Sequence, residues 1–258
     1  MLSKKKDIWI VISLCVLAFY IVFMIYPLGI LFKNAVIENN GDFTFAYFAK
    51  FLSKNYYFST VFNSFKVSLA ATALTLIIGT PLAYFYNMYK IKGKTFLQII
   101  IILCSMSAPF IGAYSWILLL GRNGLITNTI KNLTGFNFPS IYGFGGILLV
   151  LCMQLYPLVF LYVSGALRNI DNSLLEASEN MGCTGAKRFF KIIIPLCIPT
   201  ILAAALMVFM RAFADFGTPL FIGEGYRTFP VEIYNQFMNE TGSDKNFASA
   251  VSIIAIII

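Results

Sequence analysis

The stretch Asp171–Pro195 reads DNSLLEASENMGCTGAKRFFKIIIP and separates two strongly apolar runs in the second half of the chain. Ser173, followed three residues later by Glu176, has the form of a capping box, which predicts the start of a short helix. Gly182 stands where a glycine can adopt the left-handed conformation that ends a helix. Thr184 is a suitable cap for a second helical segment, which the closing proline would end. We therefore expect two short helices at an angle, forming an exposed knob.

The composition is that of a membrane protein. Hydrophobic residues make up 59% of the chain and charged residues 12%, and the mean hydropathy is +0.80. The net charge of +8 fits basic loops on one side of a bilayer better than it fits nucleic-acid binding. The five cysteines lie apart, mostly inside apolar runs, without a CxxC pair or any histidine. They are therefore interpreted as small buried hydrophobic residues, and no metal site is expected.

Six apolar runs predict an all-α, polytopic transmembrane bundle. They cover approximately residues 8–32, 60–88, 95–120, 143–167, 196–216 and 246–258. The first run follows three lysines, as in a signal peptide, but it is too long and lacks a small-residue cleavage site, so an uncleaved span is preferred. The last run is too short to cross a membrane, and we expect the chain to be cut inside a sixth span.

Two of the spans carry features that bear on packing. Along the second, Ser68, Thr72, Thr75 and Gly79 share a face of small side chains, which favours close approach of another helix. The third span is interrupted at Pro109 and Gly112. Freed backbone groups at such a break must find partners in neighbouring helices or in a water-lined cavity.

Basic residues predict the orientation of the chain. With the amino terminus in the cytoplasm, lysines and arginines concentrate in short inner connections beside spans, whereas most acids fall in the outer loops. The inner set comprises Lys4, Lys5, Lys6, Lys90, Lys92, Lys94, Arg168, Lys187, Arg188 and Lys191. This orientation places the knob in the cytoplasm, where ATP is found.

The spacing within the knob resembles the EAA loop of ABC-importer permeases, whose pattern is EAA, three residues, Gly, nine residues and Ile-x-Leu-Pro. The matching residues are Glu176, Ala177, Ser178, Gly182, Ile192, Ile194 and Pro195. Serine replaces the second alanine and isoleucine replaces the leucine, both small changes in volume. In that family the loop docks into a cleft on the ATP-hydrolysing subunit. The resemblance implies a non-enzymatic transport subunit, with ATP and Mg used by a partner ATPase; the alternative is an interfacial helical hairpin between two spans.

The resemblance extends over nearly the whole chain. Asn63-Ser64-Phe65, Gly79–Tyr84, Gly121–Ile126 and Phe213–Pro219 together look like the ferric-iron, polyamine, thiamine and phosphonate branch of type I ABC importers. Asp215–Pro219 and the later Arg227-Thr228-Phe229-Pro230 look most like the ferric-iron type. The 2-aminoethylphosphonate type is close, and the sequence does not decide between the substrates.

That family implies an architecture and a set of partners. Residues 1–258 would form one six-span permease domain of a bacterial inner membrane, with residues 168–195 as its cytoplasmic coupling loop. The implied partners are ABC ATPase subunits, an extracytoplasmic solute-binding protein, membrane lipid and a second permease half, either identical, fused or heterologous. Iron permeases of this kind often carry two six-span halves in one chain, and a cut inside the sixth span fits an amino-terminal half.

Other function classes fit less well. A channel does not need a docking knob, and a secondary transporter usually carries intramembrane acids coupled to protons or sodium. A membrane enzyme needs a nucleophile, base or metal cluster, which scattered carboxylates and the absence of histidine disfavour.

Arg211 and Asp215 lie four residues apart near the outer end of the fifth span, which places them on one face. One interpretation is that they neutralise each other in an apolar setting. The other is that they line the outer mouth of a pathway, with Thr218 and the break at Gly217-Thr218-Pro219 supplying irregular backbone there.

Overall fold

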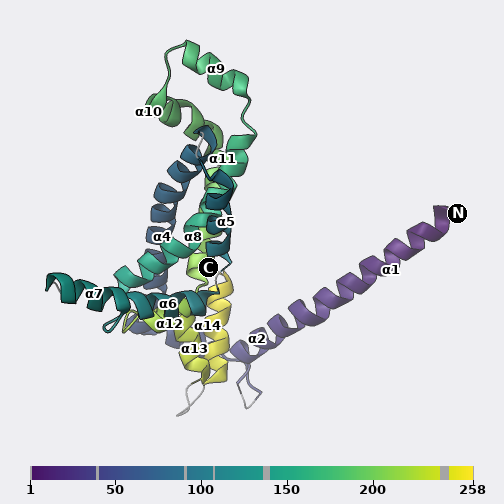
Figure 1. Cartoon of the computed structure of the whole chain (residues 1–258). Helices are drawn as coiled ribbons and strands as arrows, with labels where there is room; N and C mark the ends of the chain where they lie inside the picture. Colours follow the sequence, from purple (N-terminus) through teal and green to yellow (C-terminus); the bar gives the residue numbers. More distant parts are fainter. Residues whose placement is uncertain are drawn as a thin grey trace. The chain divides into compact units, whose positions relative to one another are not determined.

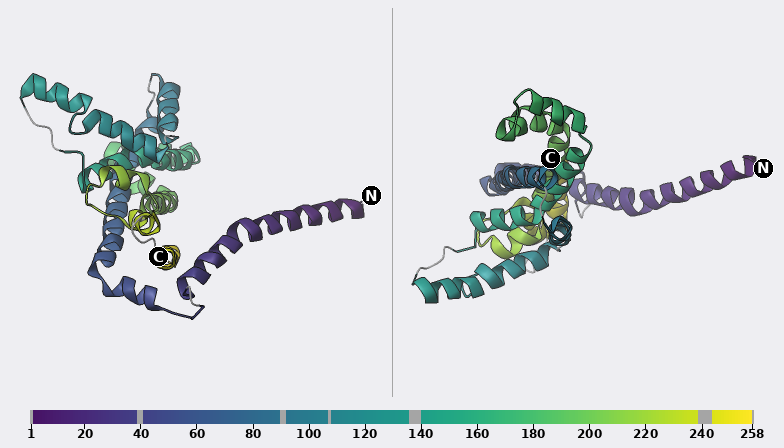
Figure 2. Two further views of the ribbon diagram at one scale, coloured as in Figure 1. Left: turned by 90° about the horizontal axis from the view of Figure 1, so that it is seen from below. Right: turned by 45° about the horizontal axis from the view of Figure 1, so that its top comes forward.

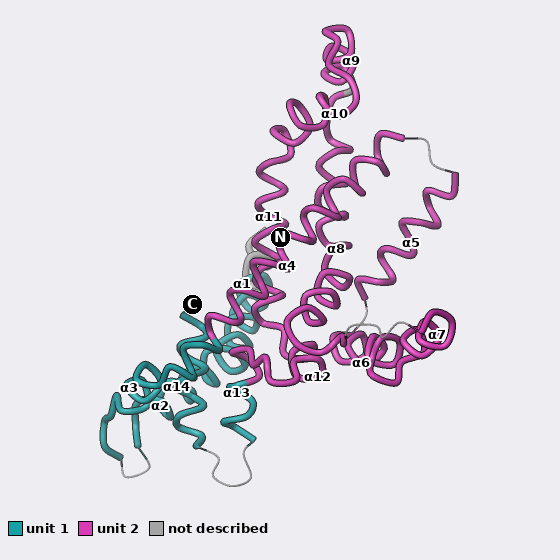
Figure 3. The backbone as a smooth tube through the Cα atoms, turned by 90° about the vertical axis from the view of Figure 1, so that its left-hand side faces the viewer, with its two compact units in different colours: residues 1–60, 232–258 teal, residues 61–231 magenta. Residues whose placement is uncertain are grey.

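The computed structural model describes residues 2–38, 41–89, 92–106, 108–135, 140–238 and 244–257 (Figure 1). Within these ranges every regular element is a helix, and the β pairing is limited to an isolated bridge between Ile37 and Phe43. The all-α prediction is therefore confirmed. The chain divides into two compact units, residues 1–60 with 232–258 and residues 61–231 (Figure 3).

The first unit contains the amino-terminal helices and the last helix. Its elements are α1 (Leu2–Tyr20), the π-helix η1 (Ile21–Ile25), α2 (Tyr26–Val36), α3 (Ala46–Ser53) and α14 (Lys245–Ile257). α14 packs against α2 and α3, where Ala35, Val36 and Ala250 are buried. In α1, by contrast, every side chain from Ile8 to Tyr20 is exposed. Such a long exposed apolar surface is what a membrane span offers to lipid or to another subunit.

The second unit contains most of the bundle. Its elements are α5 (Lys94–Ser105), α6 (Pro109–Leu120), α7 (Leu125–Thr134), α8 (Phe144–Arg168), α9 (Asn172–Asn180), α10 (Gly185–Arg188), the π-helix η2 (Phe189–Ile193), α11 (Ile194–Phe213) and α12 (Gly217–Ile222). α4 (Asn55–Met88) and α13 (Phe229–Met238) each run from one unit into the other. α7 extends away from the other helices of this unit in both views of Figure 2.

The centre of the second unit is α8, which packs against α5, α6, α11 and α12. Its Ile147, Val159 and Phe160 are fully buried. α4 approaches α8 closely at Gly79. A Cβ added to this glycine would lie 2.8 Å from Cβ of Val159, so the close approach depends on the absence of a side chain there. Ser68 and Thr75 of the same face are also fully buried. The predicted small-residue face is therefore a helix-packing surface.

Among the residues that the structure describes, four segments are long and apolar enough to cross a membrane. They are Ile8–Val36, Asn55–Met88, Phe144–Arg168 and Gly185–Phe213. The second begins at Asn55, five residues earlier than predicted. A bent pair of helices would make a fifth span, and Lys245–Ile257 is shorter. The count of six spans, and the assignment of residues 1–258 to one domain, stay predictions.

The third span is broken, as predicted. α5 ends at Ser105, α6 begins at Pro109, and the segments Lys94–Ser105 and Pro109–Thr134 are bent by 104°. Pro109 lies in the first turn of α6, where the missing N–H of proline has no helical partner to lose. Gly112 lies inside α6, so the prediction that it contributes to the break is wrong.

Both π-helices stand just before a proline. η1 ends two residues before Pro27 and η2 ends two residues before Pro195. In each case the last N–H before the proline donates to a carbonyl five residues back, from Tyr26 to Ile21 and from Ile194 to Phe189. A proline lacks an N–H and its ring crowds the carbonyl four residues upstream, and this widens the preceding turn. The helix continues through Pro195, so the prediction that this residue ends it is wrong.

Candidate functional site

The knob begins with an aspartate cap. The Asp171 carboxylate accepts a hydrogen bond of 3.0 Å from the N–H of Ser173, and α9 starts at Asn172. The predicted capping box between Ser173 and Glu176 is therefore wrong. Aspartate is at least as good an N-cap as serine, and its position two residues upstream allows the helix to start earlier.

α9 ends at a left-handed glycine, as predicted. Gly182 has φ of +72°, and its N–H donates to the carbonyl of Glu179 at 2.9 Å. The next N–H, of Cys183, donates to the carbonyl of Ser178 at 2.9 Å. These bonds satisfy carbonyls that the last turn of a helix leaves free. Thr184 precedes α10 as predicted, but its side chain makes no capping hydrogen bond.

An ion pair links the two helices of the knob. Nη1 of Arg188 in α10 lies 3.5 Å from Oε2 of Glu179 in α9. Nε of Arg188 is buried without a hydrogen-bond partner among the described residues. This pair was not predicted from the sequence. Opposite charges that flank a glycine turn are the signal that would have revealed it.

Aromatic packing joins the knob to the bundle. The ring of Phe189 lies 4.7 Å from the ring of Tyr84, a buried residue of α4. Ile193 is also buried in the core of the second unit. Figures 1 and 3 show α9 and α10 projecting beyond the ends of α8 and α11. The knob is thus exposed at its tip and anchored at its base.

The residues of the EAA pattern divide into two groups. Glu176 and Ala177 are exposed, and so are the neighbouring Leu174 and Met181, whose relative exposures are 52% and 77%. Ser178 is buried instead, and its hydroxyl donates to the carbonyl of Leu175 at 2.7 Å. Toward the base, Ile192 and Ile194 are half-buried and Pro195 is exposed. Of these residues, only Glu176 and Ala177 offer side chains to a partner at the tip of the knob.

Asp171→Ala should fray the start of α9. The hydrogen bond from the N–H of Ser173 lowers the pKa of the Asp171 carboxyl. A carboxyl with a depressed folded-state pKa stabilises the fold above its unfolded-state pKa, and this contribution is lost as pH falls through the folded-state pKa. Hydrogen exchange of α9 amides from neutral to acidic pH measures the effect. Asp171→Asn should keep much of the protection of the α9 amides from exchange but lose its pH dependence. If the Asp171→Asn variant had the pH dependence of the wild type, the role of Asp171 would be contradicted.

The residues predicted near the outer end of α11 do not all come together. Oδ2 of Asp215 accepts a hydrogen bond of 3.1 Å from the N–H of Thr218 at the start of α12. Arg211 and Asp215 form no ion pair, and the Arg211 side chain is exposed. Thr218 is fully buried. The aspartate therefore organises the turn into α12, and the neutralising pair is not present.

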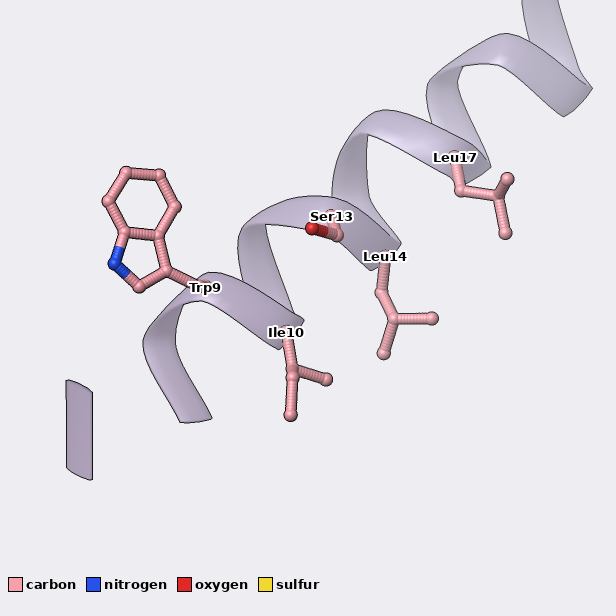
Figure 4. A pocket seen from close by; sticks show the side chains of 5 residues that line it. All are labelled: Trp9, Ile10, Ser13, Leu14 and Leu17. Atoms are coloured by element: carbon pink, nitrogen blue, oxygen red, sulfur yellow. The ribbon is translucent and has the colours of Figure 1, made fainter. Parts of the chain in front are cut away.

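The described residues offer no metal site, and a concavity on α1 offers no enclosed pocket. Among the described residues, no three His, Cys, Asp or Glu side chains are grouped so that they could hold a metal ion. A shallow concavity runs along α1, with Trp9, Leu14 and Leu17 among its lining side chains (Figure 4). It belongs to one exposed helix and therefore lacks opposing walls.

The apolar helices and the exposed helical knob define a polytopic membrane protein. A family model for the binding-protein-dependent transport system inner membrane component matches residues 75–258. The chain therefore belongs to this family of inner-membrane transport components.

Relatives agree with this membership, and a solved structure shows the same fold. A putative ferric transport system permease protein of Haemophilus influenzae is 29% identical over 259 residues, which cover 96% of this chain and 40% of that protein. A putative 2-aminoethylphosphonate transport system permease protein of Salmonella typhimurium is 24% identical over 261 residues, which cover 100% of this chain and 90% of that protein. A bacterial ABC transporter involved in the import of alginate has the same fold, with a TM-score of 0.79 at 18% identity over 98% of this chain and 91% of that chain.

Proposed function

We propose that this chain is a permease subunit of an ATP-driven ABC importer and that residues 168–195 dock on its ATPase. The observation that carries the proposal is the knob. Its tip exposes Glu176, Ala177, Leu174 and Met181, while Phe189 anchors its base against Tyr84 of α4. The tip carries both polar and apolar side chains, as protein interfaces do, and the base is firmly attached to the bundle. Such a knob suits the transmission of force from a partner. ATP and Mg bind to that partner.

The remaining partners follow from the same proposal. An extracytoplasmic binding protein delivers the solute, and a second permease half completes the pathway. The knob and the amino terminus lie in the cytoplasm, as the distribution of basic residues favours. Arg211, Asp215 and Thr218 belong to the outer mouth, where the turn from α11 into α12 supplies irregular backbone.

We propose ferric iron as the first candidate for the solute. The support is the resemblance of Asp215–Pro219 and the similarity to a ferric permease protein. The chain spans less than half the length of that relative. It spans 90% of a 2-aminoethylphosphonate permease protein, and this makes 2-aminoethylphosphonate the second candidate. Polyamines and thiamine follow.

The docking surface can be tested at the tip of the knob. Replacing Leu174 and Met181 together by aspartate puts two charges on the exposed apolar surface. We expect co-purification of the ATPase to fall about tenfold or more, because an unpaired charge at an interface costs over 1.4 kcal/mol. Leu133→Asp is a matched control, since Leu133 is 79% exposed on α7, outside the knob.

Membrane levels of both proteins and ATP-dependent uptake should be measured in the same preparations. Normal co-purification and uptake with the knob variant would remove residues 168–195 as the docking surface. Uptake that does not require ATP would instead favour a channel or a secondary transporter.

A further inference from the structure

A cavity of about 270 Å³ lies where the broken third span meets α8. Cys104 of α5, Ser115 and Trp116 of α6, and Gln154 and Tyr156 of α8 line it. All three helices belong to the second unit. Gln154 lies near the middle of the 25 residues of α8, so the cavity is at depth within a candidate span.

The break between α5 and α6 gives a physical reason for a cavity at this place. A helix that stops inside a membrane leaves backbone groups that need protein partners or water, and discontinuous helices commonly surround solute sites in transporters. α5 ends at Ser105, one residue after a residue of the lining, and Ser115 and Trp116 lie in the second turn of α6. Irregular backbone and polar side chains are therefore gathered at one place.

Gln154 is a second, independent observation. Its side chain makes no hydrogen bond within the part of the chain that the structure describes, although it lies in a helix that is otherwise strongly apolar. The Gln154 side chain is half-buried and lines the cavity, so its amide is free to donate to and accept from a polar occupant there. The other small polar group is partly used, since the hydroxyl of Ser115 donates to the carbonyl of Ile111 at 2.8 Å and retains only acceptor capacity.

The chemistry of the lining selects an occupant. Trp116 offers an N–H, Tyr156 an O–H and Gln154 both a donor and an acceptor, and the lining contains no Asp, Glu, Lys or Arg. Placing a bare multiply charged ion there is unfavourable because no opposite charge compensates for lost hydration. The volume equals about nine waters at about 30 Å³ each, enough for a small solute.

We propose that this cavity is a transit site for a small, oxygen-rich solute held by neutral hydrogen bonds. The proposal rests on the importer function proposed above and restricts the form of its cargo. Iron would pass here only with oxygen ligands of its own, and an aminophosphonate would present oxygen atoms directly. A polyamine, which is polycationic and lacks acceptor oxygens, is disfavoured.

Trp116 provides a direct reading of occupancy. The chain has two tryptophans, and Trp9→Phe leaves Trp116 as the single tryptophan of this chain. The same assembly with Trp116→Phe as well gives the background signal of the partner subunits. The assembled transporter, with its ATPase, is titrated with 2-aminoethylphosphonate, ferric citrate and spermidine. We expect a saturable change in Trp116 fluorescence with an oxygen-rich solute and none with spermidine. Gln154→Leu should raise the half-saturating concentration about tenfold, the factor that corresponds to 1.4 kcal/mol, and Gln154→Asn should recover part of the affinity.

Cys104 gives a second reading that does not depend on fluorescence. Cys15, Cys104 and Cys183 are not buried, whereas Cys152 and Cys197 are. In a variant with Cys15 and Cys183 replaced by serine, the solute that changes Trp116 fluorescence should slow labelling of Cys104 by a water-soluble thiol reagent. A matched variant that retains Cys15 and replaces Cys104 and Cys183 should be labelled at the same rate with or without solute.

The outcomes separate this proposal from the importer assignment. Unchanged Trp116 fluorescence and Cys104 labelling with all three solutes would overturn the transit site, and ATP-dependent uptake of a solute in that preparation would leave the importer function standing. A saturable response to spermidine as strong as that to the other solutes would overturn the proposed solute class. A saturable change in Trp116 fluorescence without ATP-dependent uptake of any of the three solutes would support the cavity and contradict the importer.

Discussion

Gly182→Asp should remove most solute uptake while the protein still inserts in the membrane. Gly182 has φ of +72°, and apart from its two chain neighbours no heavy atom of the described residues lies within 4 Å of the place where its Cβ would be. The fold itself therefore has room for a side chain, and the cost of the left-handed conformation is only about 1–2 kcal/mol. The larger effect is expected at the docked ATPase, where the new carboxylate would lose water without a partner. Uptake and ATPase co-purification should each fall about tenfold or more.

Two comparisons isolate the docking effect. Gly135 ends α7 with φ of +69° and has the same open surroundings, so Gly135→Asp imposes similar backbone strain outside the knob. Gly182→Asn keeps the size of the aspartate side chain without its charge. Uptake should be close to wild type in the first variant and intermediate in the second. Wild-type uptake by Gly182→Asp at equal expression would sink the assignment of this loop.

Adjacent glycines at the start of α8 should respond in opposite ways to alanine. A Cβ on Gly146 would overlap the carbonyl of Ile141 and lie 2.9 Å from Cγ2 of Ile222. Because the carbonyl is backbone, the chain must shift, and we expect Gly146→Ala to lower stability by about 3 kcal/mol or more. A Cβ on Gly145 meets nothing within 4 Å. Gly145→Ala should therefore change stability by less than about 1 kcal/mol and can be slightly stabilising, since alanine favours helix.

Thermal unfolding in detergent and the yield of folded protein measure both variants. The pair is informative because the residues are neighbours in one helix and receive the same substitution. Equal midpoints for the two variants would show that α8 does not pack against residue 141 as described.

Apolar runs predicted most of the bundle because a membrane span must be long, helical and nearly free of charge. The break before Pro109 was also predictable, because a proline interrupts the hydrogen bonding of a helix locally. The cap of α9 was not predicted correctly. Asp171 and Ser173 both have capping side chains, and only the three-dimensional turn decides between them. Local chemistry thus located the helix and misplaced its first residue.

The candidate sites depended on different kinds of information. The docking loop is a prediction from spacing, and the structure adds that Ser178 is buried while Glu176 is exposed. The prediction that Arg211 and Asp215 form a pair was wrong because helical spacing applies only within a helix, and α11 ends at Phe213. Gln154 was overlooked, although one amide in a 25-residue apolar helix is a visible signal. Its significance requires the cavity, which long-range packing creates.

The π-turn before Pro195 changes the direction in which the side chains of α10 point relative to the side chains of α11. A five-residue hydrogen-bonded turn contains one residue more than the α-helical turn it replaces, and each residue in an α-helix advances the side-chain direction by about 100°. The faces of α10 and α11 are therefore offset in phase, although η2 joins them without a loop. Shortening η2 by one residue would rotate the knob about the axis of the span by roughly that angle. The angular setting of the proposed docking surface is thus encoded by the length of a five-residue segment, independently of the side chains that the surface presents.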